Sequence, residues 1–345
     1  MKLLALPLVL LGLSAAEPAL ERRVMMMGTS LDLAIEADDR GSALAASERA
    51  VAALEATEAR LSTWRDDSEL SRWNRGVEPA ASPALAADLA AARSCREETG
   101  GAFDPAVGAL VAAWDLRGKG RVPSAAELRQ AVEAGRAGRL LEEGGFGKGA
   151  GLADALEALA AAPGVTRASL DLGGQLAVLD RQGGGRWEVP VADPRNRDRA
   201  VVSFTIDRGS VSTSGNSERG IVVDGRRLGH ILDPRTGEPA PDFGSVTVWT
   251  DDPLRADCLS TGLYVMGPER ALSWAAAHPG VEVLVLRERE GRLEALATPG
   301  LERNLKVLVP DVRVEVATES GGLRREPVRP TALTNPRGAS TPRKP

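Results

Sequence analysis

A glycine-rich loop that carries a lysine is the first segment of the sequence suited to chemistry. It spans residues 142–151 and reads Glu-Glu-Gly-Gly-Phe-Gly-Lys-Gly-Ala-Gly. Its lysine, Lys148, is one of only five lysines among 43 basic residues. Backbone amides at a glycine turn and a lysine side chain both favour phosphate, so the loop predicts a phosphate site. The alternative is a surface loop without a binding function.

Two common phosphate-binding motifs fit this loop poorly. A P-loop needs glycine at position 142 and a hydroxyl residue at 149, where the chain has Glu142 and Gly149. The looser dinucleotide pattern is satisfied by Gly145, Gly147 and Ala150. However, residues 139–143 resemble the end of a helix rather than a buried strand, so the context of a Rossmann fold is absent.

A carboxylate and a hydroxyl are spaced for one side of a helix at Asp257 and Thr261. Together they suit a hard cation such as Mg²⁺, which takes oxygen ligands and usually shares them with a substrate phosphate. The alternative is that Asp257 lies at the start of its own helix and stabilises the helix dipole. The pair alone leaves both interpretations open.

His230 precedes a predicted tight turn over residues 233–237 and so lies where a proton-transfer group could reach a cleft. A structural role is the alternative, and it is the role expected for His278, which precedes Pro279. Nucleophilic catalysis is a minor candidate. Ser214 lacks the Gly-x-Ser-x-Gly context, and neither cysteine has a histidine beside it.

Cys95 and Cys258 are the only cysteines in the sequence. Two isolated cysteines do not make a thiolate metal site. A disulfide between them would suit an exported protein, but the sequence alone does not decide whether they pair.

Helices and strands must position these residues, and their pattern shows no repeat of solenoid length. Apolar periodicity predicts helices over 43–61, 83–98, 106–114, 124–134, 152–161, 256–265 and 268–277. Ser82 with Pro83 and Ser124 with Glu127 supply N-terminal caps. Strands are predicted over 31–37, 168–172, 176–180, 187–191, 201–206, 245–249, 281–287 and 305–309. Because the strands occur in runs, an α+β fold is favoured over a doubly wound parallel sheet.

Composition narrows the class of protein. With 345 residues and 43% hydrophobic content, the chain suffices for one large domain or two ordinary ones, which rules out a small stapled scaffold. The net charge of -5 provides no basic field, so nucleic acid is not an expected partner.

The two ends of the chain differ from the middle. Residues 1–16 combine one positive charge, a short apolar run and small residues, which predicts a secretory signal peptide cleaved after Ala16. A membrane anchor is the alternative, although the run is shorter than a bilayer requires. No cysteine lies near the cleavage site, so lipid attachment is not expected. Residues 318–345 are rich in Pro, Arg, Gly, Ser and Thr and are predicted to be a disordered tail.

Taken in order, these segments resemble the ApbE family of FAD:protein FMN transferases. The order of many matches, rather than any single motif, carries the resemblance, which spans residues 25–267. The matching motifs are Met27-Gly-Thr29, Leu61-Ser-Thr-Trp64, Ser68-Glu-Leu-Ser-Arg-Trp-Asn74, Gly100-Gly-Ala-Phe-Asp-Pro105, Val107-Gly108, Lys148-Gly149, Leu170-Asp-Leu-Gly-Gly174, Ser212-Thr-Ser-Gly215, His230-Ile-Leu-Asp-Pro-Arg-Thr-Gly237, and Ala256-Asp257 with Thr261.

The resemblance implies an α+β fold of mixed, mostly antiparallel sheets flanked by helices, a T-fold-related single large domain over residues 17–317. It also implies a Mg²⁺-dependent enzyme outside the cytoplasmic membrane. Such an enzyme cleaves the pyrophosphate of FAD, leaves FMN on a Thr or Ser hydroxyl of an acceptor protein and releases AMP. The acceptor would be a membrane redox subunit or another exported flavoprotein.

By position, the resemblance also implies roles for individual residues. The FAD site would be lined by Met27, Trp64, Ala102, Phe103, Asp104, Glu142, Lys148 and Ile231. The metal would be held by Asp257, Thr261 and the backbone carbonyl of Gly145. His230 matches the histidine proposed to assist deprotonation of the acceptor hydroxyl. Trp64 and Phe103 would offer flat faces to the flavin or adenine rings.

Three departures from the family pattern fall near these residues. Glu142 replaces the usual Asp, which keeps the charge and lengthens the side chain. Alanines at positions 150 and 153 replace an aromatic residue and an Asp, with Asp154 one position later, which raises the alternative of a shifted helix. Ser260 stands where some members place a third metal-binding Asp.

Two other functions stay open on the same scaffold. One is a periplasmic FAD pyrophosphatase that passes FMN to water, and the other is a non-catalytic FAD-binding protein. The sequence defines neither the acceptor protein nor the oligomeric state.

Overall fold

The structure is a computed structural model that describes residues 20–78, 80–216, 220–223, 225–318 and 323–325. The predicted signal peptide over residues 1–16 lies outside the described residues, as does most of the predicted tail. No helix among the described residues has both the length and the apolar character needed to cross a bilayer.

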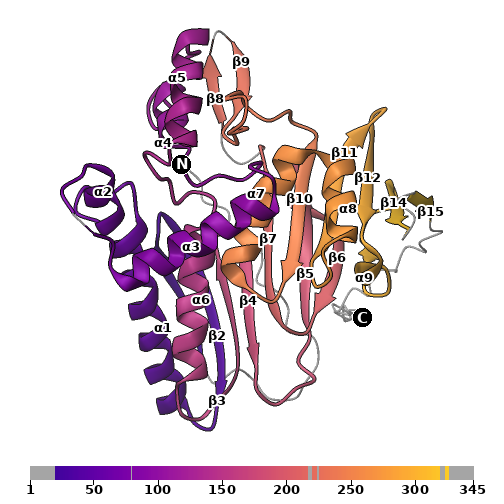
Figure 1. Ribbon diagram of the computed structural model, residues 1–345. Coiled ribbons are helices and arrows are strands. Elements are labelled where there is room, and N and C mark those ends of the chain that lie inside the picture. Colours follow the sequence, from indigo (N-terminus) through magenta and orange to yellow (C-terminus); the bar gives the residue numbers. More distant parts are fainter. Residues whose placement is uncertain (1–19, 79, 217–219, 224, 319–322, 326–345) are drawn as a thin grey trace, which may run out of the picture.

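A ten-stranded sheet runs through the centre of the described structure (Figure 1). Neighbouring strands in order are β1 (Leu20–Met26), β2 (Thr29–Ala37), β3 (Val165–Leu172), β4 (Gln175–Asp180), β7 (Gly209–Gly215), β10 (Gly244–Thr250), β11 (Glu282–Arg289), β12 (Arg292–Ala297), β14 (Val312–Ala317) and β15 (Leu323–Arg325). Every neighbouring pair is antiparallel except β12 and β14, which run parallel. The expectation of an α+β fold with mostly antiparallel strands is confirmed.

Smaller sheets and helices cover this central sheet. A three-stranded sheet has the order β13 (Lys306–Val307), β6 (Asn196–Ile206) and β5 (Trp187–Asp193), and a hairpin pairs β8 (Gly220–Val223) with β9 (Arg226–Gly229). The helices are α1 (Arg40–Leu61), α2 (Glu69–Asn74), α3 (Pro83–Glu98), α4 (Gly108–Ala113), α5 (Ala125–Arg136), α6 (Gly147–Ala160), α7 (Pro253–Met266), α8 (Pro268–Ala276) and α9 (Pro299–Glu302).

Successive side chains of a strand point to opposite faces of the sheet, so one strand can pack against two layers. In β11, Val283 and Val285 pack with α7 and α8, whereas Leu284 and Leu286 pack with β5 and β6 on the opposite face. At the other end of the sheet, α1 and α6 lie side by side over β2 and β3 (Figure 1). The central sheet is therefore buried on both faces around β11 and on the α1–α6 face at its β1–β3 end, and it supports α6 and α7.

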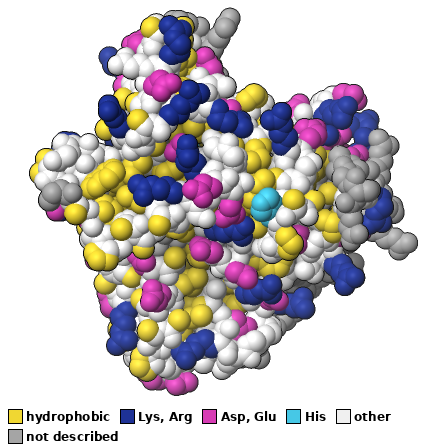
Figure 2. All heavy atoms as spheres, viewed as in Figure 1, with side chains coloured by type: hydrophobic (Ala, Val, Ile, Leu, Met, Phe, Trp, Pro, Cys, Tyr) yellow, Lys and Arg dark blue, Asp and Glu magenta, His cyan; other side chains and the backbone are white. Residues whose placement is uncertain are grey.

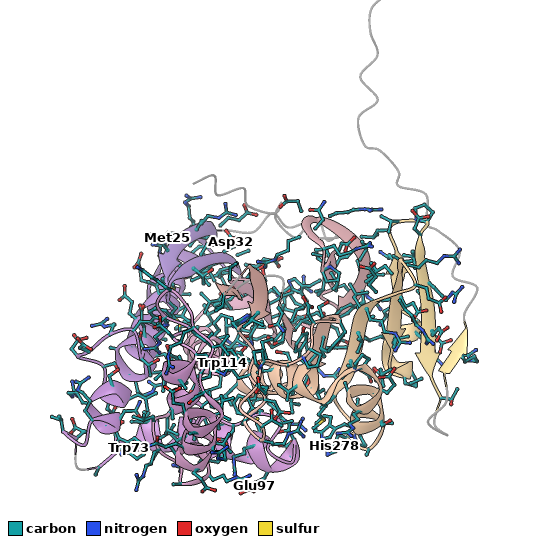
Figure 3. All side chains as sticks on the ribbon, turned by 90° about the horizontal axis from the view of Figure 1, so that it is seen from above. Met25, Asp32, Trp73, Glu97, Trp114 and His278 are labelled. Atoms are coloured by element: carbon teal, nitrogen blue, oxygen red, sulfur yellow. The ribbon has the colours of Figure 1, made fainter. Side chains whose placement is uncertain are left out.

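A projection stands above this layered body in Figure 1, made by α4, α5 and the β8–β9 hairpin. Trp114, labelled in Figure 3, is buried within this projection, and its indole nitrogen donates to the Gly237 carbonyl oxygen at 2.7 Å. This bond joins α4 to the turn that follows His230.

Local sequence signals predicted several elements correctly. Helix α3 spans the predicted residues, and the Ser82 hydroxyl accepts from the Leu85 amide at 3.2 Å. The capping box of Ser124 and Glu127 opens α5. His278 has the expected structural role, because its ring stacks on Trp274 at a centroid distance of 3.7 Å.

Other predictions were wrong where tertiary contacts decide. Helix α6 begins at Gly147, five residues before the predicted start, because its glycines pack against neighbouring elements. Residues 139–143 are not a helix end: α5 stops at Arg136, and the Glu142 amide donates to the Pro105 carbonyl oxygen at 2.8 Å. The predicted tail includes strand β15, which pairs with β14, so the boundary at residue 317 comes too early.

Gly149 is the closest approach between α6 and α7. A Cβ atom at this position would lie 2.4 Å from the Pro253 carbonyl oxygen and 2.6 Å from the Leu254 Cα atom. Both are backbone atoms, so the helix itself would have to shift to relieve the clash. Glycine is therefore required for the two helices to meet at this distance.

Replacing Gly149 with alanine is expected to destabilise the fold by about 1–3 kcal/mol despite alanine's higher helix propensity, because the added methyl group overpacks the helix contact. Urea unfolding measures the loss. Gly144→Ala is the matched control, since a Cβ at that position meets nothing within 4 Å, and it should change stability by less than about 0.5 kcal/mol. Equal stability of both variants would contradict the packing argument.

Candidate functional site

The junction of α6 and α7 brings Lys148 and Asp257 together. The Lys148 Nζ atom lies 3.2 Å from one carboxylate oxygen of Asp257, and the Gly149 amide donates to the other at 3.0 Å. Asp257 is only 3% exposed, so this carboxylate is held inside the protein by a cation and a helix-start amide. Helix α7 begins at Pro253 with Asp252 as its cap, which excludes a capping role for Asp257.

Hydroxyl groups surround this carboxylate. Ser212 and Ser214 lie on one face of β7, and their hydroxyls are 3.2 Å and 2.8 Å from the Ser260 hydroxyl. The Ser214 hydroxyl is also 3.3 Å from that of Thr261. The Ser212 hydroxyl reaches the Asp257 carboxylate at 3.5 Å. These five side chains, Ser212, Ser214, Asp257, Ser260 and Thr261, are called the oxygen cluster below.

From the sequence, Ser214 was only a minor candidate nucleophile, and Ser212 belonged only to a matching motif; neither was expected at a cation site. Their signal is the alternation Ser-Thr-Ser, which places two hydroxyls on the same face of a strand. The alternation does not by itself indicate a site, because the two hydroxyls reach Ser260 only once the fold packs α7 against β7.

Gly145 completes the approach to the oxygen cluster. A Cβ atom at Gly145 would lie 3.4 Å from the Thr261 hydroxyl oxygen and 3.0 Å from the Phe103 ring, so the loop backbone lies beside α7. The three residues expected to hold a metal, Gly145, Asp257 and Thr261, are therefore neighbours.

The chemistry of this cluster fits a hard cation. Its groups are all oxygens, the donor type that Mg²⁺ prefers. The described residues contain no group of three or more His, Cys, Asp or Glu side chains suited to a metal. A cation here would have one protein carboxylate and would need further oxygens from water or from a substrate phosphate, as is common for Mg²⁺.

The segment from Ala102 to Asp104 lies beside the same junction, but the Phe103 ring in it is not open to a ligand. Phe103 is only 3% exposed, and its Cβ atom lies 2.9 Å from the place where Gly262 of α7 would carry a Cβ. The expectation that Phe103 offers a flat face to a ligand ring is therefore wrong, because the apolar core encloses the ring. The Asp104 carboxylate accepts from the Ala106 amide at 2.9 Å and from Arg96 at 2.6 Å, which fixes this turn.

Trp64 supplies the exposed aromatic surface near this loop, with 66% of the residue accessible. The Arg117 guanidinium carbon lies 4.6 Å from the indole centroid, in a cation–π contact. Arg117 also pairs with the Glu142 carboxylate at 2.6 Å. Thr63 hydrogen-bonds with Glu142, Glu143 and Arg117 through its hydroxyl oxygen. One guanidinium therefore joins the tryptophan to the acidic start of the loop.

Electrostatics in this network act mainly on Glu142. Burial raises the pKa of Glu142 above its ordinary value, and the nearby Glu143 carboxylate raises it further, while Arg117 partly offsets both effects. Arg117 is thus the group that favours the charged form of this buried carboxyl.

The remaining residues implied by the resemblance lie on two other segments, the β1–β2 turn and the segment after β9. Met27 has a left-handed backbone at the turn between β1 and β2, with φ of 48°, and its sulfur lies against Gly151 of α6. Ile231 is buried in one apolar cluster with Ala102, and its amide donates to the Asn216 side chain at 3.2 Å. His230 is half-buried directly before Ile231, after β9.

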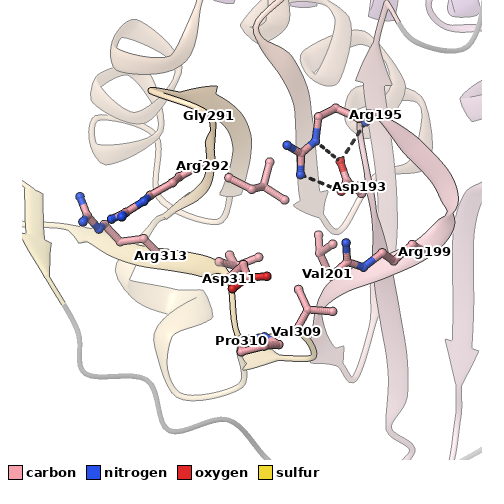
Figure 4. A pocket seen from close by; sticks show the side chains of 12 residues that line it. Asp193, Arg195, Arg199, Val201, Gly291, Arg292, Val309, Pro310, Asp311 and Arg313 are labelled. Carbon is pink, nitrogen blue, oxygen red and sulfur yellow. Dashed lines mark hydrogen bonds and ion pairs between the residues drawn. The ribbon is translucent and has the colours of Figure 1, made fainter.

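A separate cavity of about 530 Å³ lies between β5–β6 and β12–β14 (Figure 4). It contains none of the residues above, and Arg195 binds Asp193 within it at 3.0 Å. On the face shown in Figure 2, basic and acidic side chains are intermixed rather than gathered into a patch of one sign.

Comparisons with known proteins show the family of the chain. A family model described as the ApbE family matches residues 27–285. The chain is 30% identical to a FAD:protein FMN transferase of Klebsiella pneumoniae (strain 342), over 77% of this chain and 83% of the relative. It is 32% identical to a FAD:protein FMN transferase of Treponema pallidum (strain Nichols), over 70% of this chain and 77% of that protein.

Solved structures give the same result. The flavin transferase ApbE from Vibrio cholerae superposes with a TM-score of 0.68 and 26% identity, covering 83% of this chain and 98% of that one. The apo form of the Pseudomonas stutzeri flavinyl transferase ApbE superposes with a TM-score of 0.70 and 25% identity, covering 82% of this chain and 96% of that one.

Arg117→Ala is expected to raise the pKa of Glu142 further, because the variant loses the positive charge that offsets burial and Glu143. Carbon-13 NMR titration of the glutamate carboxyls measures this directly. Arg208→Ala is the control, since Arg208 pairs with the exposed Asp251 instead and should leave Glu142 unchanged. A Glu142 titration that is identical in wild type and Arg117→Ala would refute the assigned network.

Proposed function

The chain belongs to the ApbE family, and on that premise we propose that it is a FAD:protein FMN transferase that moves FMN from FAD to an acceptor protein. The observation that carries the proposal is the contact of Lys148 and the α6 start with Asp257, beside the oxygen cluster. A lysine beside clustered oxygens suits a pyrophosphate and its cation. The relatives' names supply the identity of the substrates.

In the proposed reaction, a Thr or Ser hydroxyl of the acceptor attacks the phosphorus atom of the FMN half of FAD. A phosphoester bond forms, the bond to the AMP phosphate breaks, and AMP leaves with the electron pair. The hydroxyl proton must go to a base, and we assign that role to His230, whose ordinary pKa suits proton transfer near neutral pH. When bound, Mg²⁺ would stabilise negative charge on the pyrophosphate oxygens.

The chain's own residues would divide the remaining work. Asp257, Thr261 and the Gly145 carbonyl would hold the cation, while Lys148 would bind the pyrophosphate. Trp64 would stack on a planar ring of FAD, since its face is exposed and backed by Arg117. Phe103 would shape the loop from within the core rather than touch the substrate through its ring face.

We place the protein in the periplasm or cell envelope, on the basis of the predicted signal peptide over residues 1–16. The acceptor would then be a membrane redox subunit or another exported flavoprotein.

Asp257→Asn is expected to lower FMN transfer to below about 1% of wild type. The neutral asparagine side chain removes the negative charge that pairs with Lys148 and would bind the cation. Mass spectrometry of a threonine-containing acceptor domain, incubated with FAD and Mg²⁺, measures transfer. Asp251→Asn is the matched control, because Asp251 is exposed and paired only with Arg208 among the described residues. Full transfer by Asp257→Asn would remove the role given to Asp257.

His230→Ala is expected to lower the transfer rate about 100-fold or more while FAD binding persists, because a general base acts in the chemical step. The same incubation, followed over time, gives the rate, and flavin fluorescence gives the binding. Unchanged transfer would exclude His230 as the base. In the wild type, free FMN and AMP without a flavinylated acceptor would instead identify a pyrophosphatase, and intact bound FAD would identify a binding protein.

A further inference from the structure

The only two cysteines of the chain lie in one apolar cluster between α3 and α7. Cys95 of α3 is 2% exposed and Cys258 of α7 is completely buried. They lie about 160 positions apart in the sequence. Both cysteines therefore belong to the same part of the core.

Helix spacing brings the pair to the same level of the contact. A Cβ atom at Gly262 of α7 would lie 2.9 Å from the Thr99 side chain, at the end of α3. Cys258 lies one turn before Gly262, and Cys95 lies one turn before Thr99. Cys258 therefore lies on the part of α7 that meets the C-terminal turns of α3, and these turns carry Cys95.

A further contact supports this meeting. Arg255 of α7 pairs with Glu98 of α3 at 2.8 Å, so residues before and after Cys258 both contact the end of α3.

We propose that Cys95 and Cys258 form a disulfide when the chain folds in an oxidising compartment. Both cysteines are thiols in the structure described above. In the oxidation, the two thiols lose two protons and two electrons, one S–S bond forms, and a small-molecule or protein disulfide is reduced to two thiols. The link closes a loop of about 160 residues, which restricts the unfolded chain strongly.

Burial sets the time at which the link forms. An external disulfide cannot reach two sulfurs that are buried in the folded core, because exchange needs an accessible thiolate. Oxidation therefore occurs while α3 and α7 are docking, and the finished link resists reduction. It also fixes Thr99, which accepts from the Phe103 amide at 3.1 Å, relative to the helix that carries Asp257.

The test is refolding of the full chain from denaturant with glutathione disulfide, followed by intact-mass and peptide mass spectrometry. The expected product is about 2 Da lighter than the reduced chain, with one peptide pair joined through Cys95 and Cys258. After refolding, the protein is denatured again and its free thiols are alkylated. Two alkylated cysteines, or glutathione adducts on single cysteines, would overturn the proposal. Neither result depends on FMN transfer, so the proposed function is tested separately.

Thermal unfolding supplies a second measurement. The oxidised chain is expected to unfold about 5–10 °C higher than the reduced chain. Cys95→Ala, treated in the same way, controls for effects of glutathione and should show no such difference. An equal midpoint for oxidised and reduced wild type, with the cross-link present, would refute the stabilising geometry.

Discussion

The carboxylate of Asp257 is the group on which the candidate site depends. It is buried and accepts from the Gly149 amide while it pairs with Lys148, so it joins the start of α6 to the second turn of α7. Only a glycine at 149 allows the two backbones to approach so closely. The same contact brings the glycine-rich loop beside Thr261 and the hydroxyls of β7. The groups proposed to bind the pyrophosphate and the cation thereby meet at one helix junction.

A second network holds the other end of the loop. Arg117 lies over the exposed Trp64 and pairs with Glu142, whose buried carboxyl would otherwise favour the neutral form. The loop between Glu142 and Lys148 thus connects an aromatic surface with an oxygen-rich centre. This arrangement matches a substrate that has planar rings joined through a pyrophosphate.

Signals that act within one helical turn could be predicted from the sequence. The caps at Ser82 and Ser124 and the shared face of Asp257 and Thr261 are of this kind. The hydroxyls of β7 could not be placed, because their meeting with Ser260 depends on sheet order and helix docking. The early start of α6 and the burial of Phe103 likewise follow from close packing around glycines, which local propensity does not describe. Gly145 entered only through family resemblance, since a backbone carbonyl leaves no mark on residue type.

The most direct test of the account is the binding of Mn²⁺, as a spectroscopic substitute for Mg²⁺, in the presence of FAD. Electron paramagnetic resonance measures the free ion in wild type, in Asp257→Asn and in Asp251→Asn. The account predicts a saturable site that weakens by at least about 10-fold in Asp257→Asn only. Equal affinity in all three proteins would contradict the claim that the α6–α7 junction holds the cation.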